Sequence, residues 1–234
     1  MKVLAFDTAL GGCSVAVVDT DTGNATSDVQ PMARGQSEQL VPMIQHVIER
    51  SGFAFADLDL VATTVGPGAF TGLRIGLSTA RSFGLALDLP VDGILTTEAI
   101  ATHFFEQHDG ENKELLVVLE TKRDDFYAQV FSADNKMLDE PFAVPLALLV
   151  EDYQGRALNV CGDGLTRLQH DLSANWPENW MAFPGFDLID PELMAVLAVA
   201  RRGAGHIRPA DPVYLRNADV SISTRPVRTI AERS

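Results

Sequence analysis

Three short stretches of the chain have residue types that suit phosphate or nucleotide binding. Asp7-Thr8 ends an apolar stretch, where a carboxylate could lie beside a phosphate or ligate Mg²⁺. The GPGAFTG run at 66–72 precedes a helical pattern, and the N-terminus of a helix attracts anions. Gly162-Asp163-Gly164 forms a turn that could line a nucleotide. An acid that bonds turn amides, or a glycine turn between a strand and a helix, explains the same residues without a ligand. Both interpretations stay open for Asp7, Thr8, Gly162, Asp163 and Gly164.

No established catalytic motif accompanies these stretches. The glycine-rich run is neither GxxxxGK[ST] nor GxGxxG, so it is not a P-loop or a dinucleotide-binding fingerprint. The five histidines form no HxxxH pair, and the serines lie in no GxSxG elbow. Cys13 and Cys161 are too few for a metal cluster or a disulfide scaffold. The residues therefore predict no catalytic site and no metal site.

The segment 61–87 is the element around which the rest is organised. Its β-branched start predicts a strand, its Gly-Pro-Gly a turn, and the restart at Thr71, a good N-cap residue, a helix. Small residues recur in that helix at i+4, and each glycine costs up to about 1 kcal/mol relative to alanine, so close backbone contact should offset the loss. On a helical wheel, the polar residues of this helix occupy only a narrow sector, so most of its circumference is apolar. The helix either packs tightly on its own sheet, which the pattern alone favours, or contacts another protein. The small residues are Gly72, Gly76, Ala80 and Gly84.

The other periodic segments predict two related α/β lobes. A strand meander over 2–29 is followed by a helix over 37–50, a strand at 58–65 and a helix over 97–107. At an offset of 113 residues the opening pattern repeats, with strands at 116–121 and 126–132. The polar, turn-rich segment from 109 marks the boundary. We therefore expect lobes at 1–108 and 109–224, with a flexible tail at 225–234.

Composition limits the kind of molecule. Eighteen Lys and Arg against thirty-two Asp and Glu give a net charge of −14. Nucleic-acid affinity rests largely on Lys and Arg that neutralise phosphates, so a partner should supply the positive surface for any work on RNA. No apolar run reaches the ~18 residues of a membrane span, and the N-terminus lacks the pattern of a secretory signal. We expect a cytoplasmic protein without membrane contact.

Several segments together resemble the TsaB family, also called YeaZ. The most specific is VGPGAFTGLRIGLSTARSFGLAL at 65–87, and weaker matches follow in the same order in the second half. The resemblance implies the actin-like ATPase (ASKHA) fold, whose two lobes share a duplicated α/β plan. The remaining matches are LAFDTALGGCSVAVVD at 4–19, GQSEQLVPMI at 35–44, TKRDDFYAQVF at 121–131, CGDG at 161–164 and PVYLR at 212–216.

The resemblance also implies a non-catalytic role. In that family, TsaB supports its paralogue TsaD, which transfers a threonylcarbamoyl group to the adenosine beside the anticodon of tRNAs that read ANN codons. TsaC makes the donor, and the ATPase TsaE joins the complex. TsaD-like chains carry a metal-binding HxxxH, which is absent here. The implied properties are no cofactor for this chain alone, ATP or ADP at the complex interface, a homodimer in isolation, and tRNA contact only through the complex.

In the family, the two early helices contact TsaD, and contact a second TsaB in the isolated protein. The residues that correspond here come from the helices over 37–50 and 71–87. They are Leu40, Ile44, Val47, Leu73, Gly76, Leu77, Ala80 and Gly84. One departure concerns Glu120-Thr121-Lys122-Arg123, since many relatives have an Asp-Ala-Arg segment there, so the resemblance assigns these four residues no role.

Three other functions compete with this one. The first is an ATPase or small-molecule kinase of the same fold that uses Asp7 and the GDG turn, and residual ATPase activity stays compatible with the accessory role. The second is a TsaD-like metallopeptidase or transferase, which needs a bound metal. The third is a homodimeric binding protein whose helices pair only with themselves.

Overall fold

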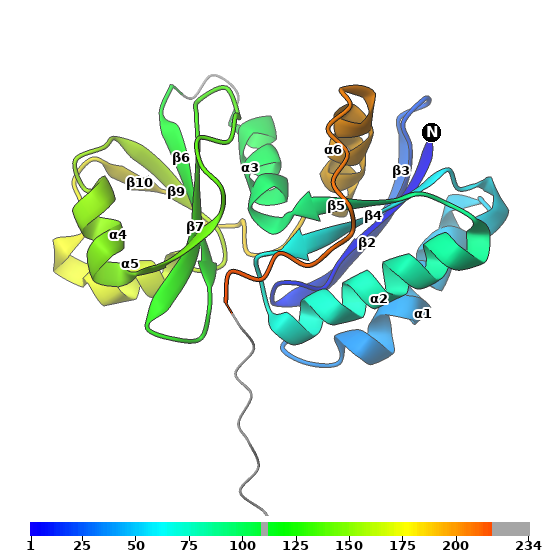
Figure 1. Ribbon diagram of the computed structural model, residues 1–234, viewed down its shortest axis with the longest axis horizontal. Coiled ribbons are helices and arrows are strands. Elements are labelled where there is room, and N and C mark those ends of the chain that lie inside the picture. Colours follow the sequence, from blue (N-terminus) through cyan, green and yellow to red (C-terminus); the bar gives the residue numbers. More distant parts are fainter. Residues whose placement is uncertain (109–111, 217–234) are drawn as a thin grey trace, which may run out of the picture.

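The computed structural model describes residues 1–108 and 112–216, which form two lobes (Figure 1). The first lobe is built on a five-stranded sheet of order β3-β2-β1-β4-β5. In this sheet β1 is antiparallel to β2 and parallel to β4. Its strands are β1 (Lys2–Asp7), β2 (Gly12–Asp19), β3 (Asn24–Pro31), β4 (Leu60–Gly66) and β5 (Val91–Leu95).

Helices cover both faces of the first sheet, which is why β1, β2 and β4 are apolar almost throughout. On one face α1 (Gln36–Ser51) and α2 (Phe70–Leu87) pack side by side, and on the other lie α3 (Thr96–Gln107) and α6 (Pro191–Gly203) (Figure 1). Short 3₁₀ turns occur at Phe55–Asp57 and Ser173–Asn175. Within the described residues, no helix combines the length and the hydropathy that a bilayer crossing needs.

The second sheet repeats the plan of the first, with order β10-β9-β6-β7-β8. β6 is antiparallel to β7 and parallel to β9, as β1 is antiparallel to β2 and parallel to β4 in the first sheet. The predicted fold class, two lobes with a duplicated meander-and-helix plan, is confirmed. The elements are β6 (Glu114–Glu120), β7 (Asp125–Phe131), β8 (Phe142–Pro145), α4 (Leu146–Tyr153), β9 (Leu158–Cys161), α5 (Leu165–Leu172) and β10 (Trp180–Ala182).

The two lobes share one hydrophobic cluster. Ala16 and Ala62 of the first sheet belong to the same buried cluster as Leu119 and Phe131 of the second, through α3 and α6. The strands of the first sheet precede the predicted boundary at residue 109, and those of the second sheet follow it. α6 also follows this boundary, but it packs on the first sheet. The division into lobes at 1–108 and 109–224 stays a prediction. Residues 109–111 and the tail at 225–234 lie outside the described residues.

The small residues of α2 face the chain's own first sheet. A Cβ on Gly72 would lie 1.9 Å from the carbonyl oxygen of Thr8, and one on Gly76 would lie 3.0 Å from the Thr8 hydroxyl. A Cβ on Gly84 would lie 2.4 Å from a methyl of Val91. Close packing on the sheet therefore offsets the cost of these glycines, and no second protein is needed to explain them.

The start of α2 differs from its predicted form. The helix begins at Phe70, and its N-cap is Ala69, which provides no side-chain hydrogen bond. The backbone holds this end instead, because Ala69 N donates to the Ala9 carbonyl at 2.8 Å and Leu73 N donates to the Ala69 carbonyl at 2.9 Å. Thr71 is thus inside the helix, and the N-cap prediction at Thr71 was wrong.

Substitution of Gly72 by alanine should destabilise the fold, because the added Cβ has no space beside the Thr8 carbonyl. We expect Gly72→Ala to lower the free energy of unfolding by about 3 kcal/mol. The matched control is Gly203→Ala in α6, where a Cβ would meet nothing within 4 Å. That variant should keep its stability or gain up to about 1 kcal/mol. Urea titration followed by circular dichroism measures both, and equal stabilities would contradict the packing described here.

Candidate functional site

The Asp7 carboxylate at the end of β1 is held by the chain itself. Asp7 is 1% exposed, and its Oδ1 accepts hydrogen bonds from the Thr64 hydroxyl at 2.5 Å and from Ala9 N at 2.9 Å. Burial raises the pKa of this carboxyl above its ordinary value, against the lowering effect of these hydrogen bonds. The neighbouring Thr8 hydroxyl donates to the Gly72 carbonyl at 2.7 Å. Both side chains fasten β1 to β4 and α2.

The glycine turn after β9 packs on β6. Gly162 has φ +112°, and a Cβ there would lie 2.2 Å from the Val118 carbonyl oxygen, so this position requires glycine. Asp163 Oδ1 accepts a hydrogen bond from Glu120 N at 2.9 Å. Burial, together with the nearby charges of Glu120 and Asp187, raises the pKa of Asp163 to about 7, against the lowering effect of that hydrogen bond. The turn therefore fixes the end of β6.

Two cavities lie between parts of the two lobes, and the predicted nucleotide-proximal residues do not share one. Thr8 lines the first, of about 670 Å³, and Asp163 lines the second, of about 690 Å³. Asp7, Gly162 and Gly164 are part of neither lining. Among the described residues, no group of three His, Cys, Asp or Glu side chains is placed to hold a metal ion. A nucleotide contact at these five residues stays a prediction.

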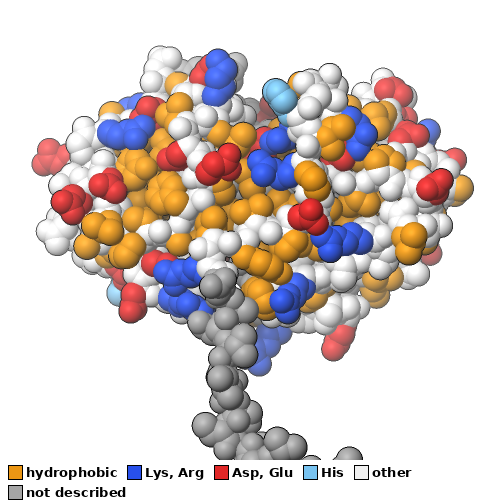
Figure 2. Space-filling view, viewed as in Figure 1, with side chains coloured by type: hydrophobic (Ala, Val, Ile, Leu, Met, Phe, Trp, Pro, Cys, Tyr) orange, Lys and Arg blue, Asp and Glu red, His pale blue; other side chains and the backbone are white. Residues whose placement is uncertain are grey.

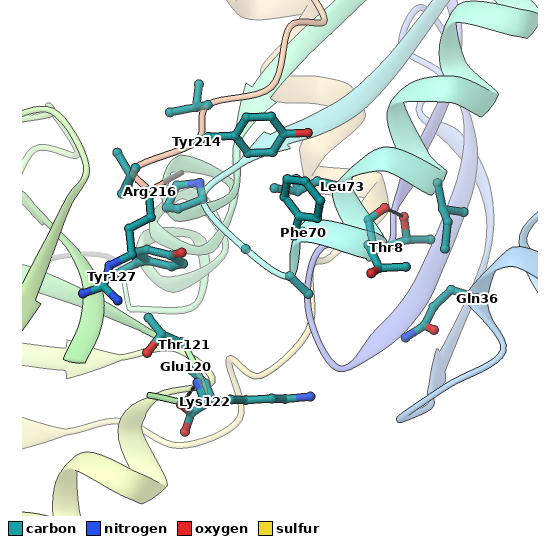
Figure 3. Close-up of a pocket in the computed structure, with 18 of the residues that line it drawn as sticks. Thr8, Gln36, Phe70, Leu73, Glu120, Thr121, Lys122, Tyr127, Tyr214 and Arg216 are labelled. Atoms are coloured by element: carbon teal, nitrogen blue, oxygen red, sulfur yellow. Dashed lines mark hydrogen bonds between the residues drawn. The ribbon is translucent and has the colours of Figure 1, made fainter. Parts of the chain in front are cut away.

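The first cavity, hereafter the interlobe cleft, has polar and aromatic walls from both lobes (Figure 3). Gln36 at the start of α1 and Phe70 at the start of α2 line one side. Lys122 and Tyr127 line the other, from the β6–β7 hairpin, and Lys122 extends toward the first lobe. Tyr214 from the segment after α6 closes a third side.

The eight residues predicted to contact a partner lie in the interior. Leu40, Ile44 and Val47 of α1 are buried against β1 and β2. On α2 the predicted residues are buried as well, and face the sheet. The structure therefore places these side chains in the interior of the chain and not on its surface. The α2 residues among them are Leu73, Gly76, Leu77, Ala80 and Gly84. Partner binding by the two helices stays a prediction.

The outer face of α1 and α2 carries apolar residues that sequence reasoning missed. Leu85 is 88% exposed, and Val41 on α1 is 41% exposed. Phe83 is partly buried and stacks on Phe55 at 5.5 Å between ring centroids, which leaves part of both rings at the surface. The helical wheel held the signal for Leu85, which lies outside the arc of α2 that packs on the sheet, whereas Phe83 lies at the flank of α2 beside α1. We define the outer face by Val41, Phe83 and Leu85.

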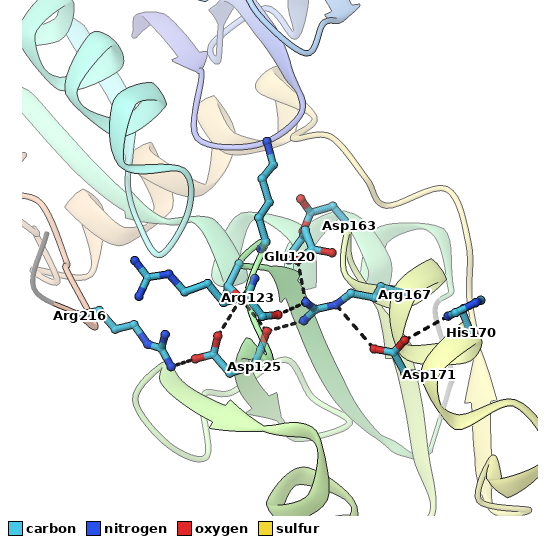
Figure 4. Close-up of polar contacts among 10 residues, drawn as sticks. Glu120, Arg123, Asp125, Asp163, Arg167, His170, Asp171 and Arg216 are labelled. Atoms are coloured by element: carbon cyan, nitrogen blue, oxygen red, sulfur yellow. Dashed lines mark hydrogen bonds and ion pairs between the residues drawn. The ribbon is translucent and has the colours of Figure 1, made fainter. Parts of the chain in front are cut away.

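Arginines hold the β6–β7 hairpin in a polar cluster (Figure 4). The Arg167 guanidinium lies over the Phe126 ring at 3.7 Å, pairs with Glu120 at 3.0 Å and donates to backbone carbonyls of the hairpin. On the opposite side Arg216 forms an ion pair with Asp125, which is 3% exposed. Sequence reasoning missed both arginines, although Arg216 belongs to the PVYLR segment.

Comparison with known proteins gives consistent results. Residues 29–147 match the family model described as TsaD, tRNA N6-adenosine threonylcarbamoyltransferase. The chain is 27% identical to the tRNA threonylcarbamoyladenosine biosynthesis protein TsaB of Escherichia coli, over 93% of this chain and 95% of that protein. It is 26% identical to TsaB of Haemophilus influenzae, over 93% and 94%. In fold it is similar to YeaZ from Pseudomonas aeruginosa, with TM-score 0.77, 23% identity, and coverage of 92% and 99%.

The Asp163 carboxyl should make stability depend on pH. Because its pKa rises from 3.8 to about 7 on folding, the folded chain keeps a proton that the unfolded chain has released, and stability falls as pH rises through this window. Between pH 5 and pH 8 we expect this group to lower the free energy of unfolding by an amount on the order of 2 kcal/mol. Asp163→Asn keeps the acceptor for Glu120 N and should remove this loss.

Urea titration at pH 5 and pH 8 measures this difference. The matched control is Asp152→Asn on α4, which replaces an exposed carboxylate and should retain the pH dependence of the natural chain. Equal pH dependence in Asp163→Asn and the natural chain would show that Asp163 does not titrate in this window.

Proposed function

Because the chain belongs to the TsaB (YeaZ) proteins of the TsaD-like family, we propose that it is an accessory subunit for threonylcarbamoyladenosine formation in tRNA. In this proposal it binds and orders TsaD, which modifies the adenosine next to the anticodon of tRNAs that read ANN codons. The chain itself transfers no group. TsaE joins the complex, and in isolation the chain pairs with a second copy through the same helices.

The observation that carries the proposal is the outer face of α1 and α2. Leu85 is the most exposed of the large apolar side chains in the described residues, on a helix whose other apolar residues are mostly covered. Burial of one such side chain against a partner contributes about 1.5–3 kcal/mol. Apolar residues near the centre of an interface contribute most of its binding free energy. A partner that covers Leu85 would gain affinity, and it would also have to provide polar groups for the exposed Arg81 and Ser82 one turn earlier on α2.

The charge of the chain supports an indirect contact with tRNA. With a net charge of −14, the chain repels a phosphate backbone unless another protein supplies the positive surface. A role as a protein-binding subunit agrees with this charge. ATP or ADP at the junction with TsaD belongs to the same proposal, since the starts of α1 and α2 line the interlobe cleft.

The proposed interface is tested by Leu85→Glu, which places a charge on the outer face without touching the core. We expect it to remain folded and to weaken binding to TsaD at least about tenfold, because a buried unpaired charge is costly. The matched control is Leu148→Glu on α4 of the second lobe, a residue that is 49% exposed. Isothermal titration with purified TsaD measures both, and unchanged affinity in Leu85→Glu contradicts the proposed interface.

The ATPase or kinase alternative is tested by Asp7→Asn. That alternative needs the Asp7 carboxylate at a ligand, whereas the side chain is buried and bonded to Thr64 and Ala9. We expect any ATP turnover by the purified chain to persist in Asp7→Asn once folding has been verified by circular dichroism. Loss of turnover in a folded Asp7→Asn variant would favour the enzyme alternative.

A further inference from the structure

The segment 208–216 after α6, hereafter the C-terminal clip, runs from the edge of the first sheet to the second lobe (Figure 1). Its beginning is bonded to β5, since Gly93 N donates to the Arg208 carbonyl at 2.9 Å. Further along, Val213 N donates to the Val65 carbonyl at 2.7 Å, at the end of β4. The first part of the clip is therefore attached to the first sheet by backbone hydrogen bonds.

The clip is also attached to α2. Arg81 donates two hydrogen bonds to the Ala210 carbonyl, at 3.1 and 2.6 Å. The Tyr214 ring lies 5.1 Å from that of Phe70, between ring centroids, and its hydroxyl accepts a hydrogen bond from Arg74 at 3.3 Å. These contacts place Tyr214 in the wall of the interlobe cleft (Figure 3). The clip thus follows one side of α2 for most of its length.

The far end of the clip reaches the second lobe through one charge pair. Arg216 pairs with Asp125 at the start of β7, whose Oδ1 also accepts a hydrogen bond from the Thr121 hydroxyl at 2.8 Å. Asp125 is nearly buried, and Arg167 donates to its carbonyl (Figure 4). A charge-assisted pair in such a desolvated place is stronger than a pair on the open surface, and removal of one partner leaves the other charge unpaired.

The joint between the lobes combines a packed core with cavities. The cluster that contains Ala62, Leu119 and Phe131 continues from one sheet to the other. The interlobe cleft of about 670 Å³ separates the lobes, and residues 213–216 of the clip line it. The packed core can serve as a hinge for the interlobe cleft, because closely packed side chains resist separation and a cavity does not.

We propose that the C-terminal clip holds the interlobe cleft at its present width by fastening α2 to the β6–β7 hairpin, and that the cleft opens when Arg216 leaves Asp125. The inference rests on contacts within this chain and does not depend on the proposed function. Its test therefore uses the isolated chain.

Spin labels on exposed residues of the two lobes measure the width of the cleft. The labels go on Gln39→Cys in α1 and Gln169→Cys in α5, both exposed positions. The native Cys13 and Cys161 are buried, and burial raises the pKa of the Cys13 thiol to about 12, so they react slowly with the label. We expect Arg216→Ala to shift the distance distribution to longer distances. Hydrogen exchange of the Val213 amide should become about tenfold faster.

Two further variants make the test specific. Asp125→Asn keeps the acceptor for Thr121 and should reproduce the shift to longer distances. The double variant should shift the distances no further than either single variant, because each substitution removes the same ion pair. Arg156→Ala is the matched control, because Arg156 pairs with Glu114 inside the second lobe. It should leave the distribution unchanged. An unchanged distribution in Arg216→Ala, or an equal shift in Arg156→Ala, overturns the proposal.

Discussion

The contact of Gly72 with the turn after β1 is the constraint on which the other features depend. The Thr8 hydroxyl donates to the Gly72 carbonyl, and the absence of a Cβ allows the helix to approach the Thr8 backbone. Ala69 N, just before α2, donates to the Ala9 carbonyl, which fixes the beginning of the helix. Because this contact sets the position of α2 on the sheet, it also sets which residues of α2 face outward and which line the interlobe cleft.

α2 therefore connects features that are far apart on the surface. On one flank Phe83 stacks on Phe55, beside α1, and on the other Arg81 binds the C-terminal clip. Its start, at Phe70, lines the interlobe cleft. A protein bound on the outer face would contact a helix that also holds the clip. Binding there and the width of the cleft would then influence each other reciprocally, if the two states of the cleft differ in the position of α2.

The sequence predicted the elements and their duplicated order well, because each strand and helix has a strong local pattern. Which side chains of those elements reach the surface could not be predicted as well. An apolar arc identifies the side of a helix that is buried, and for α1 and α2 that side faces the chain's own sheet, so Ile44 and Leu77 are interior residues while the exposed Leu85 escaped notice. The pair Arg216–Asp125 joins distant segments and has no local pattern. Burial of Asp7 and of Asp163 depends on neighbours from other strands, and Asp7 lies near enough for its charge to help raise the pKa of Asp163.

The arginines explain why an acidic chain would need a partner to act on RNA. Six of the arginines in the described residues form ion pairs with carboxylates of the same chain, so their charge is already compensated. Phosphate contact would require these pairs to break, and the pairs with Asp92 and Asp125 involve nearly buried carboxylates that would be left without a counter-ion. The pairs are Arg81–Asp211, Arg156–Glu114, Arg167–Glu120, Arg201–Glu98, Arg202–Asp92 and Arg216–Asp125. On the face shown in Figure 2, Lys and Arg side chains are interspersed with Asp and Glu side chains. The six paired arginines thus serve the structure of the lobes and the clip, and this agrees with the proposed action through another protein.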